Sequence, residues 1–302
     1  MQKGTGIKHI VIAGAGTMGI SMAQIFARYG YQVSVYEIND VGIEMAKTLL
    51  EISQKAAVEE EELTSDQSRT IMSLIHFTRE INVIFKADFV IEAIIENLEA
   101  KKEFWYDASR KADEDVVLVT NTSGLSITEI AKSIKHPQRF AGMHWINPPH
   151  LVPLVEIIKG EETMPEALEI VRQLALSVHK KPVMVKKDVP GFVLNRIQFA
   201  ILRECLHLVE NDIADVADVD NVMKFGLGMR YACIGPFQTA DFGGLDVFHT
   251  IGTYLFGDLS DEKEVPALLA RHYQSGEFGT KTGKGFYEYG EGEVEEAIKN
   301  RD

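Results

Sequence analysis

Short apolar runs rich in β-branched residues alternate with stretches of helical periodicity from residue 7 to about residue 186. This alternation is typical of a parallel sheet whose faces are covered by helices. A serine or threonine followed by glutamate in an S/T-x-x-E pattern, as at Ser126 and Thr163, predicts the start of a helix. The runs predict strands over residues 7–13, 32–37, 88–93, 116–120, 139–145, 154–159 and 182–186, with helices between them.

The pattern changes after Asp188. Apolar residues then recur at steps of three or four from Val193 to Leu208, which predicts a long helix over residues 192–213. Turns are expected at residues 226–228, 235–236 and 243–244, in a region where strands largely stop. We therefore predict a Rossmann-like, doubly wound α/β dinucleotide-binding domain over residues 1–186, followed by an all-α C-terminal domain over residues 187–302.

The composition limits the kinds of molecule that this chain is expected to bind. The 302 residues are 45% apolar, enough to build a sizeable core without disulfides or metals, and the net charge of −14 would repel nucleic acid and anionic membranes. The two cysteines, Cys205 and Cys233, form no metal or redox spacing, and so few thiols fit a reducing compartment. The longest apolar runs are far shorter than the roughly 18–20 residues that cross a bilayer. We expect a cytoplasmic protein that acts on a small molecule and binds no metal.

Residues 14–19 form a G-x-G-x-x-G sequence that directly follows the first predicted strand and opens a helix. Glycines there permit a tight turn, close backbone approach to a pyrophosphate, and close helix packing. The second predicted strand ends at Glu37, whose carboxylate can bind both ribose hydroxyls of the adenosine and would repel a 2′-phosphate. The pattern favours NAD over NADP, while FAD stays open from this fingerprint alone. The residues of the predicted nucleotide turn are Gly14, Gly16, Thr17, Met18 and Gly19.

Polar residues also gather where predicted strands end, at the edge of a parallel sheet that borders the ligand crevice. Ser123 follows one strand and His144 lies near the end of another. Glu156 comes twelve residues after His144 across a proline turn, a separation that can bring two strand ends together. A histidine beside a carboxylate is suited to general base catalysis, because the carboxylate fixes the tautomer and stabilises the imidazolium. Taken singly, these residues and Asn195 each have an equally good structural interpretation.

Several motifs occur in one order along nearly the whole chain. Together with the glycine sequence, they resemble the L-3-hydroxyacyl-CoA dehydrogenase family. The resemblance implies that His144 is the base and Glu156 its partner, and that Ser123 and Asn195 hydrogen-bond the reacting oxygen or position the substrate. The motifs are Ile-Glu-Ala-Ile-Ile-Glu at 91–96, Asn-Thr-Ser at 121–123, Gly-Met-His at 142–144 and Lys-Thr-Gly-Lys-Gly-Phe-Tyr at 281–287.

The resemblance also implies the reaction. His144 removes a hydroxyl proton while the carbinol hydride passes to the nicotinamide of NAD, which leaves a 3-keto product. A homodimer formed through the C-terminal domain and a place in fatty acid metabolism are implied in the same way. The residues implied to contact NAD are Glu96, Lys101, Ser123, Asn147 and Lys281.

The residues point to two different classes of substrate. Four glutamates at 59–62 occupy a stretch where family members that use CoA esters carry lysines, and Pro153 replaces another lysine. Residues 153–156 and 226–232 look like relatives that act on free hydroxy acids, such as L-carnitine and L-gulonate dehydrogenases, and Arg230 can then pair with a substrate carboxylate. Residues 235–246 look more like the CoA-ester branch. Our main hypothesis is an L-3-hydroxyacyl-CoA such as 3-hydroxybutyryl-CoA. The alternatives are a free 3-hydroxy acid and, more remotely, an NAD-binding protein without catalytic activity.

Overall fold

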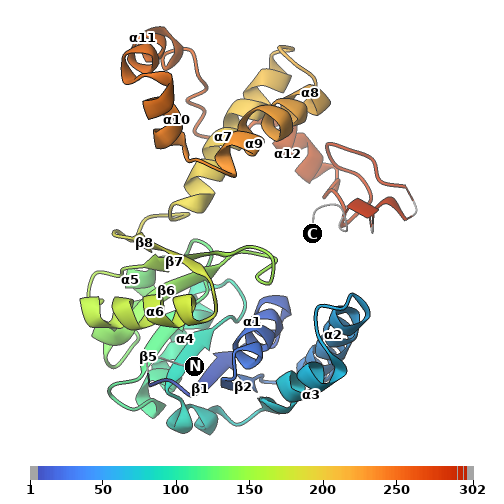
Figure 1. Cartoon of the computed structure of the whole chain (residues 1–302). Coiled ribbons are helices and arrows are strands. Elements are labelled where there is room, and N and C mark those ends of the chain that lie inside the picture. Colours follow the sequence, from blue (N-terminus) through green and yellow to red (C-terminus); the bar gives the residue numbers. More distant parts are fainter. Residues whose placement is uncertain (1–5, 291, 295, 298–302) are drawn as a thin grey trace. The chain divides into compact units, whose positions relative to one another are not determined.

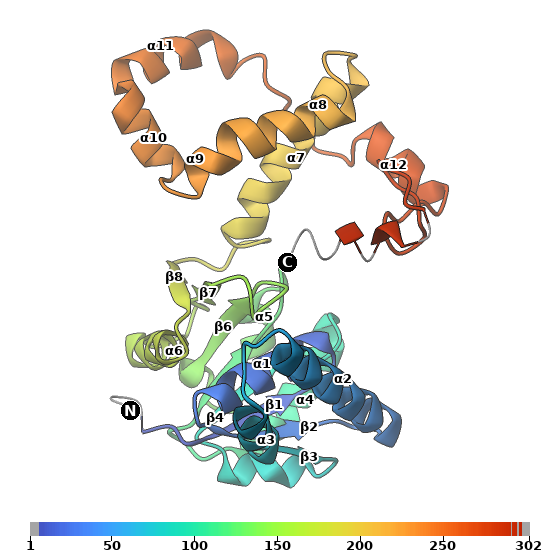
Figure 2. The same ribbon diagram turned by 45° about the vertical axis from the view of Figure 1, so that its right-hand side comes forward.

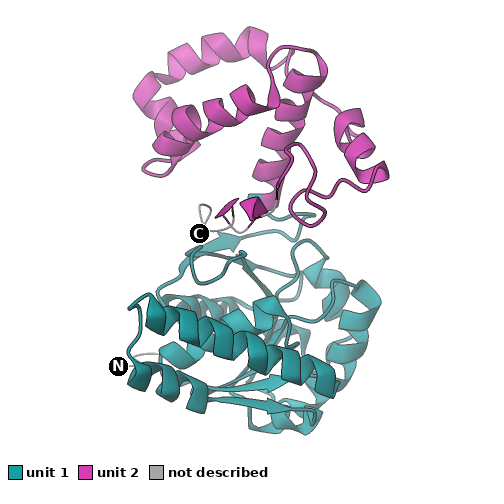
Figure 3. Cartoon of the chain, turned by 90° about the vertical axis from the view of Figure 1, so that its right-hand side faces the viewer, with its two compact units in different colours: residues 1–194 teal, residues 195–302 magenta. Residues whose placement is uncertain are grey.

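The computed structural model describes residues 6–290, 292–294 and 296–297. The chain divides into two compact units, residues 1–194 and residues 195–302 (Figure 3). Unit 1 contains the whole sheet and its covering helices, whereas the described part of unit 2 consists of helices, turns and isolated bridges. The predicted fold class, an α/β domain followed by a helical domain, is confirmed.

One eight-stranded sheet runs through unit 1, with the strand order β3-β2-β1-β4-β5-β6-β7-β8. Neighbouring strands are parallel except β6 and β7, which are antiparallel. Chain order reverses between β1 and β4, so their carboxyl ends border a topological switch point, the place where such sheets bind ligands. The strands are β1 His9–Ala13, β2 Gln32–Tyr36, β3 Ile75–Thr78, β4 Phe89–Glu92, β5 Val117–Thr120, β6 Phe140–Trp145, β7 Leu154–Ile158 and β8 Lys181–Val185.

All the predicted strands are present, with two corrections. The sheet has an additional strand, β3, a short edge strand that follows helix α3 (Ser65–Ser73) almost directly. The expectation of a parallel sheet is wrong for β6 and β7, because the loop over residues 146–153 is too short for the crossover that parallel neighbours require.

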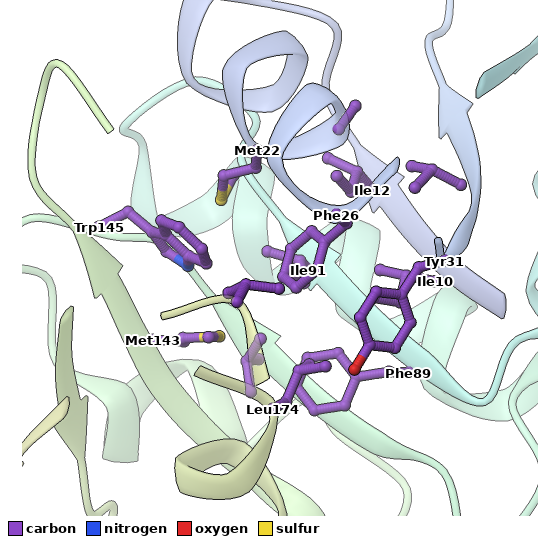
Figure 4. Packing of buried hydrophobic residues seen from close by; sticks show 14 of the residues in the cluster. Ile10, Ile12, Met22, Phe26, Tyr31, Phe89, Ile91, Met143, Trp145 and Leu174 are labelled. Carbon is purple, nitrogen blue, oxygen red and sulfur yellow. The ribbon is translucent and has the colours of Figure 1, made fainter. Parts of the chain in front are cut away.

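Both faces of the sheet are buried. In β1, Ile10 and Ile12 lie in one apolar cluster and Val11 in the other, as the alternation of side chains along a strand dictates. Phe26 of α1 (Thr17–Arg28) packs in the first cluster (Figure 4), and Trp105 of α4 (Leu98–Lys111) packs in the second. Helices therefore cover both faces (Figures 1 and 2), which explains why the strands read as continuous apolar runs. Besides α3, the elements around the sheet are α1 Thr17–Arg28, α2 Asp40–Glu59, α4 Leu98–Lys111, α5 Ile127–Ala131, α6 Pro165–Ser177 and the 3₁₀ turns η1 Ile81–Lys86 and η2 Pro137–Arg139.

Of the two predicted helix N-caps, Ser126 and Thr163, one is present in the structure and the other is not. Ser126 caps α5, as predicted, and its side chain accepts a hydrogen bond from the Glu129 N–H. Thr163 does not cap α6, because its hydroxyl donates to the Phe140 carbonyl and accepts from the Gly160 N–H. That helix instead begins with Pro165 at its first turn, where a missing N–H costs little.

Unit 2 begins within the long helix α7 (Leu194–Glu210), which lies inside the predicted range. The turn predicted at 226–228 is wrong, because these residues continue a π-helical segment, η3 (Val222–Gly228). Gly244 has a φ of 90° and separates α10 (Pro236–Gly243) from α11 (Leu245–Leu255), as predicted. The other helices are α8 Val216–Asn221, α9 Met229–Tyr231, α10 Pro236–Gly243, α11 Leu245–Leu255 and α12 Ala267–Gln274.

Large apolar side chains of unit 2 are mostly exposed. Among its described residues only Leu206 and Val219 are buried apolar side chains, whereas Phe237, Phe242 and Phe256 are 87%, 79% and 79% exposed. An exposed apolar surface of this extent is typical of an interaction site. Among the described residues, no helix has the length and apolar character needed to span a membrane.

Candidate active site

The glycine-rich turn lies between β1 and α1. Gly14 has a φ of 104°, and a Cβ there would lie 2.5 Å from the Ala93 carbonyl oxygen. A Cβ on Gly19 would lie 2.0 Å from the Gly14 carbonyl oxygen, so neither position accepts a side chain. Gly16 has open space around its missing Cβ and precedes α1 without a side-chain cap, which leaves backbone N–H groups of a helix N-terminus for an anion. Thr17 and Met18 are the first residues of that helix.

Glu37 follows β2 and is held by its neighbours. Its Oε1 accepts hydrogen bonds from the Ile38 N–H at 2.8 Å and the Asn39 side-chain amide at 3.1 Å, and its Oε2 accepts from the Ala15 N–H at 3.2 Å. These donors fix the carboxylate at the carboxyl end of the strand, beside the glycine turn.

A cavity of about 700 Å³ opens beside this turn. Its size lies within the roughly 300–1,000 Å³ that is usual for ligand pockets. A glycine turn, an uncapped helix N-terminus and an acidic residue at the end of the second strand are the groups that NAD requires, so the residues present fit this cofactor. The lining includes Gly14, Ala15, Gly16, Tyr36, Glu37, Ile38, Ala93, Ile94, Ile95 and Phe104.

His144 and Glu156 form a buried pair. They lie directly opposite each other in the antiparallel register of β6 and β7, and His144 Nδ1 lies 2.9 Å from Glu156 Oε2. The two residues are 5% and 1% exposed. The second carboxylate oxygen, Oε1, accepts the Val193 and Leu194 backbone N–H groups at 3.0 and 2.9 Å. The sequence prediction that a turn brings these two residues together therefore agrees with the geometry.

The surroundings decide the charge of this pair. Burial by itself would raise the pKa of Glu156, but the hydrogen bonds from His144, Leu194 and Val193 outweigh it and hold the pKa below the usual 4.5. An ionised Glu156 can only accept a hydrogen bond, which assigns the proton to His144 Nδ1 and leaves Nε2 as a proton acceptor.

The two N–H donors come from a turn with unusual backbone geometry. Gly191 and Phe192 both have positive φ, 73° and 51°, and Phe192 is fully buried with its ring centroid 5.8 Å from that of His144. Non-glycine residues rarely adopt such a φ, and they do so mostly where the surrounding structure enforces it. Here the turn directs two consecutive N–H groups at Glu156 and places an aromatic ring against the imidazole.

Ser123 lies in the loop after β5, next to the strand that carries His144. The Asn121 side chain accepts a hydrogen bond from the Trp145 N–H at 2.8 Å, which ties this loop to the end of β6. The Ser123 N–H donates to Glu96 Oε1 at 2.8 Å. The loop is therefore held on both sides, and Ser123 itself is exposed.

The remaining predicted residues are distributed over both units. Asn147 is exposed in the loop after β6, and Lys101 is buried on α4. Asn195, Arg230 and Lys281 belong to unit 2. The nucleotide turn and the residues Ser123, His144 and Glu156 all lie in unit 1. Glu92 is a buried carboxylate that sequence reasoning missed, although a charged residue at the end of an apolar strand was a visible signal.

Comparison with known protein families and structures shows which family the chain belongs to. The model of the NAD-binding domain of 3-hydroxyacyl-CoA dehydrogenase matches residues 9–189, and the model of the C-terminal domain of 3-hydroxyacyl-CoA dehydrogenase matches residues 191–289. The chain belongs to the 3-hydroxyacyl-CoA dehydrogenase family. The predictions of family, of NAD as cofactor and of a dehydrogenase are thereby confirmed.

Similar proteins differ in their named substrates. The chain is 38% identical to a probable 3-hydroxybutyryl-CoA dehydrogenase of Bacillus subtilis, over 94% of this chain and 98% of the relative. It is 36% identical to a 5-formyl-3-hydroxy-2-methylpyridine 4-carboxylate 5-dehydrogenase of Mesorhizobium japonicum, over 94% of this chain and 91% of the relative. A crystal structure of an enzyme of the latter name, described as an NAD+-dependent dismutase, superposes with a TM-score of 0.88 at 34% identity and covers 98% of this chain and 95% of its own.

Proposed function

We propose that this dehydrogenase oxidises a secondary 3-hydroxyl group to a 3-keto group, with NAD as hydride acceptor. The observation that supports it most is the buried pair of His144 and Glu156, with 2.9 Å between Nδ1 and Oε2, in the same unit as the glycine-lined cavity. A carboxylate that holds one ring nitrogen leaves the other to take the hydroxyl proton.

Each residue has a distinct role in this proposal. His144 removes the hydroxyl proton during oxidation and returns it during reduction, and Glu156 orients the ring and stabilises the imidazolium. Ser123 and Asn195 hydrogen-bond the reacting oxygen. NAD, when bound, accepts the hydride of the carbinol carbon. The proposed NAD-binding residues are Gly14, Gly16, Thr17, Met18, Gly19, Glu37, Glu96, Lys101, Ser123, Asn147 and Lys281.

The proposed substrate is an L-3-hydroxyacyl-CoA similar to 3-hydroxybutyryl-CoA, which would give the enzyme a place in fatty acid metabolism. The names of several relatives support this choice. The free-acid alternative also has support, because the glutamates at 59–62 are poor neighbours for a phosphate and one relative is named for a pyridine carboxylate. Arg230, an exposed residue of α9, would bind the carboxylate of such a substrate.

The proposal extends to assembly and location. Residues 187–302 would form the substrate and dimerisation domain, and the exposed apolar side chains of unit 2 would be covered in a homodimer. The small number of cysteines supports a cytoplasmic location.

The deciding experiment follows NADH absorbance with purified protein. We expect reduction of acetoacetyl-CoA to be much faster than oxidation of free acids such as L-carnitine, L-gulonate and hydroxymethylpyridine carboxylates. Turnover of a free acid alone would replace the acyl-CoA assignment, and Arg230→Ala should then raise KM for that acid. No turnover on either class would contradict the proposed function.

A further inference from the structure

Glu92 is the last residue of β4 and is fully buried, yet the proposed reaction does not use it. Its Oε1 accepts hydrogen bonds from Lys101 Nζ at 2.5 Å and the Ile94 N–H at 2.9 Å. Its Oε2 accepts from Thr120 Oγ1 at 2.7 Å and Trp105 Nε1 at 3.3 Å. A buried carboxylate with donors on both oxygens is a rigid anchor, because each donor restricts its movement.

Lys101 connects this anchor to the surface. Its side chain is 1% exposed, and its Nζ lies 2.5 Å from Glu92 Oε1 and 3.4 Å from Glu96 Oε2. The ammonium therefore lies between two carboxylates, one buried and one 46% exposed. The sequence resemblance implies that Lys101 contacts NAD, and in the structure its ammonium also holds these two carboxylates.

Glu96 links Lys101 to the loop after β5. Its Oε1 accepts hydrogen bonds from Thr122 Oγ1 at 2.5 Å and from the Ser123 N–H at 2.8 Å. An exposed glutamate has many rotamers, and the Lys101 ammonium selects the one that reaches this loop. Through these contacts the end of β5 is joined to the segment after β4, which lines the cavity through Ala93, Ile94 and Ile95.

The geometry points to Glu92 and Lys101 as positioning residues that act through Glu96 to fix the Ser123 loop against the segment bordering the cofactor cavity. Neither residue touches a reacting atom in this role. Since Ser123 is assigned to the reacting oxygen, this inference rests on the proposed function. Hydride transfer depends steeply on the distance between donor and acceptor carbons, so a loosened loop would lower turnover.

The test compares Lys101→Met with the double variant Glu92→Gln/Lys101→Met in the full-length protein. The single variant leaves a buried carboxylate without its ammonium, and we expect its thermal midpoint to fall by about 5 °C or more. The double variant removes both charges, so most of this loss should be restored. In both variants kcat, measured at saturating NAD, should stay about tenfold or more below the wild-type value. Lys102→Met is the matched control, because Lys102 lies on the same helix and forms a salt bridge with the exposed Glu99.

Amide hydrogen exchange of residues 121–125 supplies a measurement that does not depend on turnover. The Ser123 N–H should exchange faster in both Lys101 variants and at the wild-type rate in Lys102→Met. If the double variant recovers kcat as well as its thermal midpoint, Glu92 and Lys101 have only a structural role. Unchanged exchange of the Ser123 N–H would lead to the same conclusion. A large rise in the Kd for NAD with unchanged exchange of the Ser123 N–H would limit Lys101 to a cofactor contact and overturn the positioning role. An inactive wild-type enzyme would refute the proposed function but leave the exchange result to decide this inference.

Discussion

A histidine serves as a general base when one ring nitrogen is held and the other is left for the substrate. In this chain Glu156 holds Nδ1 of His144, and two backbone N–H groups hold Glu156 in turn. The proposed base is thus held by one hydrogen bond to Glu156, and Glu156 is held by two backbone N–H groups.

Removal of the imidazole should abolish proton transfer and leave the cofactor site intact. We expect His144→Gln to lower kcat by about 100-fold or more, with the Kd for NAD unchanged, because general base catalysis is worth roughly 10²–10⁴-fold. Steady-state kinetics and a fluorescence titration with NADH measure the two quantities. Near-normal turnover in the folded variant would exclude His144 as the base.

Acid should weaken the fold through Glu156. Its pKa in the folded protein lies below the ordinary 4.5, so its stabilisation is present above about pH 4.5 and is lost as the pH falls through the folded pKa. The free energy of unfolding in urea, measured between about pH 3 and 7, should fall more steeply at low pH for the wild type than for Glu156→Gln. Parallel curves for the two proteins would contradict this expectation.

The carboxylate after β2 should set the choice of cofactor. Glu37→Ala removes the charge that would repel a 2′-phosphate, so the preference for NAD over NADP in kcat/KM should fall by about tenfold or more. Glu80→Ala, a change on the exposed residue after β3, serves as the control. An unchanged preference in Glu37→Ala would remove this residue from cofactor discrimination.

At the scale of elements, the turn at Gly191 and Phe192 should matter for both stability and catalysis. Gly191→Ala places a Cβ at a φ of 73°, which costs about 1 kcal/mol, and it shifts the turn that donates to Glu156. Gly30→Ala is a matched control, because Gly30 has a φ of 86° and open space around its Cβ position. Both variants should lose similar free energy of unfolding, but only Gly191→Ala should also lose kcat. An equal effect on kcat in both would show that the turn has no special part in the site.

Local patterns predicted those elements whose causes are local. The glycine turn, the capping serine at 126 and the pairing of His144 with Glu156 follow from spacing along a short stretch of chain. Thr163 failed as a cap because a distant carbonyl, that of Phe140, takes its hydroxyl. Glu92 was missed because its donors come from α4, β5 and the segment after β4, which only the folded sheet brings together.

At the scale of the whole molecule, the exposed apolar side chains of unit 2 bear on whether the protein forms a dimer. Unit 2 leaves most of its large apolar side chains exposed, and Phe242 on α10 is 79% exposed. Phe242→Asp should therefore shift the protein from dimer to monomer in light scattering after size exclusion. Val41→Asp, a change at a 71% exposed position on α2 in unit 1, should leave the mass unchanged. A wild-type monomer would contradict the proposed dimer.

The antiparallel pairing of β6 and β7 has a consequence for how such an enzyme can diversify. His144 and Glu156 lie on two strands of one hairpin, and the loop over residues 146–153 between them is anchored by Lys180, which donates to the Pro149 and Val152 carbonyls. Insertions in that loop keep the pair intact as long as the strands stay in register. A single-residue deletion inside either strand would turn one partner to the opposite face of the sheet. Evolution can therefore remodel the hairpin's tip for new substrates, while the paired strands tolerate almost no change in length.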